Sequence, residues 1–506
     1  GLYESEFVPL NRAAFDDIVL VEPCSGMILG TYRELVQEGR NIGRYEFFSD
    51  VPKLTDEQEV IAGLSVNHRL EYGEVDLAFS YANLRSDSSG LDTDISALPT
   101  QLGFANDDDT IMFAAARFTS PDSDMFEYIV GVSYYDEERL TERNITVFNP
   151  TIGDYAPFNP IPEQRQAGYD LAVFGSATFG LGIKGLSGTV GLRYDEAYRE
   201  SDQDAYSLVF GPTVFNFLAV DDNQNYTQWL PRFAMTYEAS DHINLYASAA
   251  KGYLPGGFNL AASADPSVAE EITQFGEEIV WSYELGLKSR FPNGKGFING
   301  AIFYIESDGW QEIQVDVDPE TGFITTPTYF SNAADIVSQG FEIELQYEPT
   351  DNLLLNAAFG YTDAEYKNFD FVQGFRGQPA QIERLDGIPV KLVPDYDLNL
   401  AAQYDFDSGL FIRGEANFLG ETALEERSRE LDPNTGRATQ EAVQRYNLSA
   451  GYETKHYSLT LFAENVTDER VASGLAFTNL TFGWDGTFYA PIAPPRVLGV
   501  ELEARF

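Results

Sequence analysis

The last stretch of the chain constrains the fold most, because it alternates strictly between apolar and polar or small side chains. Residues 496–506 read Arg-Val-Leu-Gly-Val-Glu-Leu-Glu-Ala-Arg-Phe. One face carries Leu498, Val500, Leu502, Ala504 and Phe506. A period of two residues places successive side chains on opposite faces of a β-strand. The stretch is therefore predicted to be a strand with one apolar face and a terminal aromatic residue.

The same period recurs through most of the chain and predicts about seventeen strands, arranged as hairpins plus one final strand. Residues 338–349 show it clearly, because Phe341, Ile343 and Leu345 alternate with glycine and glutamate. The predicted strands are 59–71, 73–86, 110–118, 125–136, 168–180, 186–198, 226–238, 242–254, 278–289, 296–306, 338–349, 351–363, 393–405, 408–420, 442–453, 456–468 and 496–506. Such a chain is all-β.

The connections between these strands alternate between tight turns and long polar loops. Pro292-Asn293-Gly294-Lys295 is one of the turns, and most of the predicted loops run for about twenty to thirty residues. Short turns at one end and long loops at the other are typical of transmembrane antiparallel β-barrels, with the turns periplasmic and the loops outside. Residues 1–58 lack a sustained period and are predicted to be an outer-loop segment before the barrel of residues 59–506.

Charge and composition exclude other classes. The formal net charge of −48 argues against nucleic-acid binding, which needs clustered Lys and Arg. It leaves open a solvated acidic surface or an acidic funnel that concentrates cations. The sequence has no run of eighteen apolar residues, so no membrane-spanning helix is expected. Cys24 is the single cysteine, so the chain cannot form an internal disulfide.

Several short motifs, in their order and spacing, make residues 59–506 similar to one known family. They are Leu245-Tyr246-Ala247-Ser248 running into 251–259, Ser282-Tyr283-Glu284-Leu285-Gly286, Asn332-Ala333-Ala334 before Gln339-Gly340-Phe341, Glu464-Asn465-Val466-Thr467-Asp468, and the terminal Phe506. Together they resemble the barrel of TonB-dependent outer-membrane receptors and transporters. The resemblance implies a barrel of the 22-stranded receptor type, in which Phe506 would serve as the barrel-assembly signal.

The resemblance also implies a function in the outer membrane of a Gram-negative bacterium. Family members are active importers of scarce ligands, and a ferric siderophore is the expected cargo. Outer loops would capture the ligand, and a plug moved by the TonB energy-coupling complex would open the path. The expected partners are outer-membrane lipid and lipopolysaccharide, a plug-containing N-terminal segment or chain, the TonB complex and the small-molecule ligand. A passive porin-like channel and a barrel-based structural or adhesive surface protein are the alternatives.

The odd number of predicted strands bears on how the ring closes. The first and last strands would both run from the loop side to the turn side, so they cannot pair antiparallel with each other. Counting back from the end makes 59–71 the sixth strand of a family barrel. We therefore expect a separate segment or chain to supply the plug and about five strands, or a barrel that starts afresh within 1–58.

Candidate ligand-binding residues lie near the outer end of strand 242–254 and in the strand that follows it. Tyr253, Phe258 and Asn259 could line a ligand vestibule, although Gly256-Gly257 could simply bend the strand into its loop. Glu284 is expected to face the lumen, where it would draw cationic cargo or pair with a basic side chain.

Catalytic and metal-binding residues are not predicted. His68, His242 and His456 share no metal-ligand spacing. No nucleophile elbow or phosphate loop appears in the sequence, so neither an enzymatic activity nor a cofactor is expected.

Overall fold

The computed structural model shows an all-β protein. It describes residues 19–21, 28–31, 54–92, 101–123, 126–149, 154–210, 213–217, 219–259, 273–314, 329–373, 381–424, 439–471, 477–478, 488–489 and 493–505. Every regular element with assigned bounds in these ranges is a β-strand. Among the described residues there is no helix with the length and hydropathy of a membrane span.

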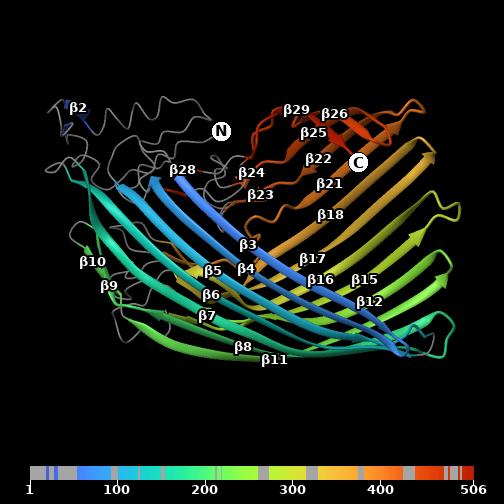
Figure 1. Cartoon of the computed structure of the whole chain (residues 1–506), viewed down its shortest axis with the longest axis horizontal. Helices are drawn as coiled ribbons and strands as arrows, with labels where there is room; N and C mark the ends of the chain where they lie inside the picture. The colour runs from blue at the N-terminus through green and yellow to red at the C-terminus, as the bar shows by residue number, and fades with distance from the viewer. Residues whose placement is uncertain are drawn as a thin grey trace.

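Seventeen of the strands form one closed barrel, and strands that follow one another along it pair antiparallel (Figure 1). They are β3 (Leu54–Leu70), β4 (Gly73–Asp92), β5 (Gln101–Thr119), β6 (Phe126–Asn149), β7 (Asp154–Gly180), β8 (Leu186–Gln203), β11 (Val220–Ser240), β12 (Ile243–Leu254), β15 (Glu278–Arg290), β16 (Gly296–Gln314), β17 (Tyr329–Thr350), β18 (Leu353–Lys367), β21 (Tyr396–Asp405), β22 (Leu410–Leu419), β25 (Val443–Glu453), β26 (Tyr457–Glu464) and β29 (Val497–Ala504).

The other described strands form two-stranded sheets outside this ring of pairs. They are β1 (Val19–Val21) with β2 (Ile28–Thr31), β9 (Tyr206–Phe210) with β10 (Thr213–Phe217), β13 (Gly257–Phe258) with β14 (Gln274–Phe275), β19 (Asp370–Gln373) with β20 (Gln381–Arg384), β23 (Thr422–Ala423) with β24 (Thr439–Gln440), and β27 (Phe477–Thr478) with β28 (Phe488–Tyr489).

Each of the seventeen predicted strands corresponds to one barrel strand, but the outer ends were placed wrongly. A loop of about thirty residues was predicted between 136 and 168, whereas β6 continues to Asn149 and β7 already begins at Asp154. Similarly, β3 begins at Leu54, inside the segment predicted to be loop. Beyond the apolar band both faces of these strands are polar, so the sequence period that marks a strand fades there.

The barrel is therefore much longer on one side than on the other. The tall wall, defined as β4–β8 and β11, has strands of 18–27 residues. The short wall, defined as β21, β22, β25, β26 and β29, has strands of 8–11 residues. Figure 1 shows the tall-wall strands, blue to green, sweeping along nearly the whole barrel, while the orange and red strands stay near one end.

Alternate residues of each strand face outward and inward. On β6, Val130, Val132 and Tyr134 are exposed apolar side chains of one face. The opposite face carries charged residues such as Arg139, which pairs with Asp109 of β5. An apolar outer band with a polar interior is the arrangement of a transmembrane barrel.

Rows of aromatic side chains limit the apolar band of the tall wall. Tyr169 stacks between Tyr134 and Tyr198, with ring centroids 6.1 and 5.3 Å away. Near the short turns, Phe118 lies 5.9 Å from Tyr128. Aromatic rings concentrate at the two membrane–water interfaces, so these rows place the membrane between them.

The ring closes where β29 and β3 are neighbours. Sixteen antiparallel pairs connect these two strands through the rest of the barrel, so both run toward the short turns, as the sequence predicted. Their side chains are exposed along almost their whole length. Leu502 is 74% exposed, compared with 47% for Val130 of the tall wall.

Candidate functional site

A short folded segment after β12 lies on the inner wall of the barrel. We call it the inner shelf, defined as residues 255–259 and 273–277, and its core is the pairing of β13 with β14. Gln166 of β7 donates to the carbonyl oxygen of Phe258 at 3.0 Å. On the other side, Gln311 of β16 donates to the carbonyl oxygen of Pro255 at 3.1 Å. Because β7 and β16 lie on different parts of the ring, a segment that bonds to both lies inside it.

Asparagine side chains fix the shelf to β16 and β17. The side chain of Asn259 donates to the carbonyl oxygen of Phe330 at 2.8 Å and accepts from the backbone N–H of Phe330 at 2.7 Å. Asn332 donates to the carbonyl oxygens of Gly276 and Gly309, at 3.1 and 2.7 Å. These amides satisfy backbone groups that strand pairing leaves unpaired, which holds the shelf in one position.

Gly256 permits the close approach on which the shelf depends. A Cβ atom at this position would lie 2.1 Å from the carbonyl oxygen of Phe275 and 2.6 Å from the hydroxyl of Tyr226. The Tyr226 hydroxyl itself donates to the Phe275 carbonyl oxygen at 3.1 Å. Gly256 therefore does more than bend the strand into its loop, since any larger residue would separate the shelf from β11.

A second inward structure covers β17 and β18. We call it the inner core, a set of buried side chains. Its members are Ala334, Ile336, Ala364, Tyr366, Phe369, Leu385 and Val390. The segment after β20 reaches this place by pairing with the outer end of β18, where the backbone N–H of Val390 donates to the carbonyl oxygen of Ala364 at 2.9 Å.

A buried ion pair lies beside the inner core. The Nζ atom of Lys391 is 2.7 Å from the Oε1 atom of Glu312, whose side chain is only 6% exposed. Tyr366 donates to the other carboxylate oxygen at 3.3 Å. A buried carboxylate needs such partners, so the pair ties the segment around Lys391 to β16.

Charged side chains on the inner face of the tall wall are matched across strands. Arg139 donates to Asp109 at 2.7 Å, and Arg143 lies 3.0 Å from Asp107. Deeper in the barrel, Arg199 lies 2.7 Å from Asp170. These pairs line the outer half of the interior with fixed donors and acceptors but little unbalanced charge.

The predicted ligand residues occupy different places in this arrangement. Phe258 and Asn259 belong to the shelf and are only 7% and 5% exposed, so their side chains hold the shelf itself. Tyr253 lies just before the shelf, where it interacts electrostatically with the inward-facing Asp170 and Asp195.

Glu284 lies deeper, facing the interior of β15. It is five residues along the strand from Ile279, the partner of Tyr253, which is about 16 Å at the rise of a β-strand. Tyr246 donates to its carboxylate. The structure therefore joins Phe258 with Asn259, places Tyr253 beside them, and keeps Glu284 apart.

Two predicted features lie outside the described residues, namely Phe506 and Cys24. Among the described residues, no three His, Cys, Asp or Glu side chains gather as metal ligands.

Sequence reasoning missed the residues that hold the shelf and the inner core. Asn332 lies in the motif Asn332-Ala333-Ala334, which was a usable signal, whereas Gln311, Glu312 and Lys391 carry no pattern that separates them from surface residues.

Comparisons with known proteins agree on one fold. Residues 25–466 match the family model described as TonB dependent receptor-like, beta-barrel. A metal-pseudopaline receptor of Pseudomonas aeruginosa is 27% identical over 242 residues, which cover 47% of this chain and 29% of the receptor.

Solved structures extend the likeness over nearly all of the chain. The ferric yersiniabactin uptake receptor from Yersinia pestis superposes with a TM-score of 0.68 at 17% identity, over 90% of this chain and 61% of that one. The siderophore receptor from Acinetobacter baumannii gives 0.65 at 16% identity, over 89% and 64%. At such identities the likeness shows the fold alone, and this chain spans about three fifths of those receptors.

Proposed function

The chain belongs to the TonB-dependent receptor β-barrel family, and on that premise we propose that it is the barrel of an active importer for a metal–chelator complex. The family is found in the outer membrane of Gram-negative bacteria, and we assign this chain to the same membrane. A ferric siderophore is the cargo we favour. The printed names of the similar proteins support this class, since they include receptors for ferric yersiniabactin and for metal-pseudopaline.

The inner shelf is the observation that carries the proposal. A passive pore gains nothing from a folded segment inside its mouth, whereas a receptor uses such a ledge to hold a ligand above the path. The shelf is fixed to opposite sides by amide side chains, so it presents a preorganised surface. In this scheme Tyr253, beside the shelf, contacts the ligand.

Gating would come from a plug. We propose that a plug-containing segment, coupled to TonB, sits within this barrel and that the paired charges of the tall wall face it. Outer-membrane lipid and lipopolysaccharide would surround the apolar band. The barrel would then act as scaffold and vestibule, while the moving part and its energy come from those partners.

Uptake measurements test this proposal. Cells that express the whole receptor should accumulate radiolabelled iron from one member of a panel of ferric catecholate, hydroxamate and carboxylate complexes, and uptake should stop when TonB is deleted. Tyr253→Ala should lower uptake about tenfold, the effect of losing one aromatic contact. Tyr283→Ala, on the outer face, is the matched control and should leave uptake unchanged.

A second measurement separates the importer from the porin-like alternative. In planar bilayers an importer with its plug conducts little, whereas a passive channel shows a steady open conductance. Steady conductance of the whole receptor, with uptake of small solutes that does not need TonB, would replace the importer reading with the channel reading.

A further inference from the structure

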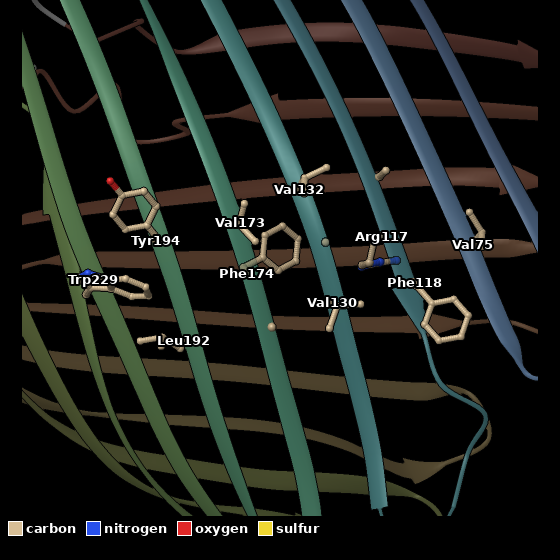
Figure 2. A pocket seen from close by; sticks show the side chains of 13 residues that line it. Val75, Arg117, Phe118, Val130, Val132, Val173, Phe174, Leu192, Tyr194 and Trp229 are labelled. Atoms are coloured by element: carbon tan, nitrogen blue, oxygen red, sulfur yellow. The ribbon is translucent and has the colours of Figure 1, made fainter.

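The outer face of the tall wall carries an apolar groove. Its volume is about 790 Å³, within the range of small-molecule sites. It crosses the strands from Val75 on β4 to Trp229 on β11, and Figure 2 shows its lining side chains. The lining side chains that face outward are apolar, and several are strongly exposed, such as Val173 at 54% and Trp229 at 59%.

Strand register explains why this surface is hollow. One row of neighbours runs Phe118–Val130–Gly175–Leu192, and the next runs Ala116–Val132–Val173–Tyr194–Trp229. Small and branched side chains occupy the middle of both rows, while large rings stand at the ends. Figure 2 shows Phe118 at one end and Trp229 with Tyr194 at the other, with valines between them. The result is a trough with aromatic ends.

We propose that this groove binds one acyl chain of a phospholipid in the periplasmic leaflet. The groove is continuous with the membrane-facing band of the barrel, so its occupant comes from the bilayer. Arg117 is the one charged residue of the lining, and it donates to Asp76 of the neighbouring strand at 2.8 Å on the inward side. The outward lining therefore offers apolar contact and suits a hydrocarbon chain.

The length of the groove fits this occupant. Five strand spacings separate β4 from β11, which is about 24 Å at roughly 4.8 Å per spacing. Because barrel strands tilt by roughly 40° from the membrane normal, a groove perpendicular to them rises about 15 Å. That is the depth of one leaflet of a hydrocarbon core about 30 Å thick.

The aromatic end at Phe118 assigns the leaflet. Phe118 belongs to a cluster beside the short turns, with Tyr72 at 6.4 Å and Tyr128 at 5.9 Å between ring centroids. Short turns are periplasmic in these barrels, and such rings lie at the headgroup level. A chain that enters at Phe118 and ends at Trp229 therefore belongs to a periplasmic phospholipid.

Native mass spectrometry of the whole receptor tests the site. The receptor is loaded with phosphatidylethanolamine and then stripped with increasing detergent. We expect one phospholipid to remain bound after the others have left. Ala116→Phe fills the middle of the groove and should lower its occupancy roughly tenfold, the factor for about two methylene groups that lose apolar contact.

The matched control is Ala247→Phe, at an exposed position of β12 that does not line the groove. It should retain the phospholipid as the unmodified receptor does. Val132→Phe provides a second filling variant, and the shift of unheated protein on a gel shows whether each variant is folded. Equal retention in all folded variants would overturn the proposal, because it would mean ordinary boundary lipid. Selective retention of lipopolysaccharide would overturn it as well.

Discussion

The two sides of the barrel build their outer parts differently. The tall wall continues its strands beyond the aromatic row and joins them by backbone pairing and exposed ion pairs, such as Arg139 with Asp109. At β17 and β18, toward the short wall, the chain instead folds inward over the inner core and buries the ion pair of Lys391 with Glu312.

This difference shows which side depends on packing. Exposed ion pairs contribute about 0–1 kcal/mol each, so the tall wall relies on many backbone bonds and tolerates changes at single side chains. The inner core concentrates its stability in a few buried contacts, where the loss of one partner costs several kcal/mol.

Removing one partner of each ion pair should give the largest contrast. Lys391→Met leaves Glu312 buried without its cation and should destabilise the inner core by roughly 3–5 kcal/mol. Arg139→Met, in the exposed pair, should cost at most about 1 kcal/mol. Hydrogen exchange of the segment around residue 390 and of β6 measures both effects. Equal protection losses at the two places would contradict the comparison.

A charge on the outer face should separate membrane-spanning wall from extension. Leu461 lies in the eight-residue strand β26 and is 55% exposed, so Leu461→Arg should cost roughly 2–4 kcal/mol in lipid. Leu140→Arg is the matched change on β6, six residues beyond the Tyr134 ring, and should be nearly neutral. Equilibrium unfolding in phospholipid vesicles gives both values. A large cost at Leu140 would show that the membrane reaches higher on the tall wall.

Loss of one amide should free the shelf without opening either wall. Asn259→Ala leaves the backbone groups of Phe330 without their partner and should cost about 1–3 kcal/mol locally. Faster hydrogen exchange at 255–259 is the expected observation. Asn223→Ala, at an exposed position of β11, should change exchange by less than about 0.5 kcal/mol. Unchanged exchange in the first variant would show that other contacts hold the shelf.

The smallest expected effect is a pH dependence of the tall wall. Arg165 donates to Glu200, as does Tyr198, and these bonds hold the pKa of Glu200 below its ordinary value of 4.5. A lowered folded-state pKa gives a contribution that is present above the ordinary value and is lost as the pH falls through the lowered one. Acidification below about pH 4 should therefore increase proteolysis at the outer end of β8, by at most about 1 kcal/mol of opening free energy. Glu200→Gln should abolish this pH dependence.

The sequence predicted the membrane-spanning part of the barrel well and its outer parts poorly. Alternation such as Phe341, Ile343 and Leu345 exists because lipid and interior impose opposite demands on the two faces, so it locates strands and their short turns. The outer part of β7, from Asp154 to Gln166, has polar side chains on both faces and prolines among them, and it carries no such signal.

The candidate site was predictable only in part, for a similar reason. Gly256, Phe258 and Asn259 were singled out, and they do form one folded unit. What they contact was not predictable, because Asn332 and Gln166 act through single hydrogen bonds to backbone groups far away in the sequence. Glu312 and Lys391 are 79 positions apart, and a lone charged residue in a polar stretch does not reveal that it is buried.

The direction of β3 and β29 limits how a barrel of this kind changes in size. A duplicated or deleted hairpin alters the number of strands by two, so it preserves the odd count and leaves these edge strands running the same way. Only the gain or loss of an odd number of strands gives a ring that is antiparallel throughout. Lineages that grow by copying hairpins therefore inherit their closure unchanged, and an engineer who wants a fully antiparallel ring has to add a single strand.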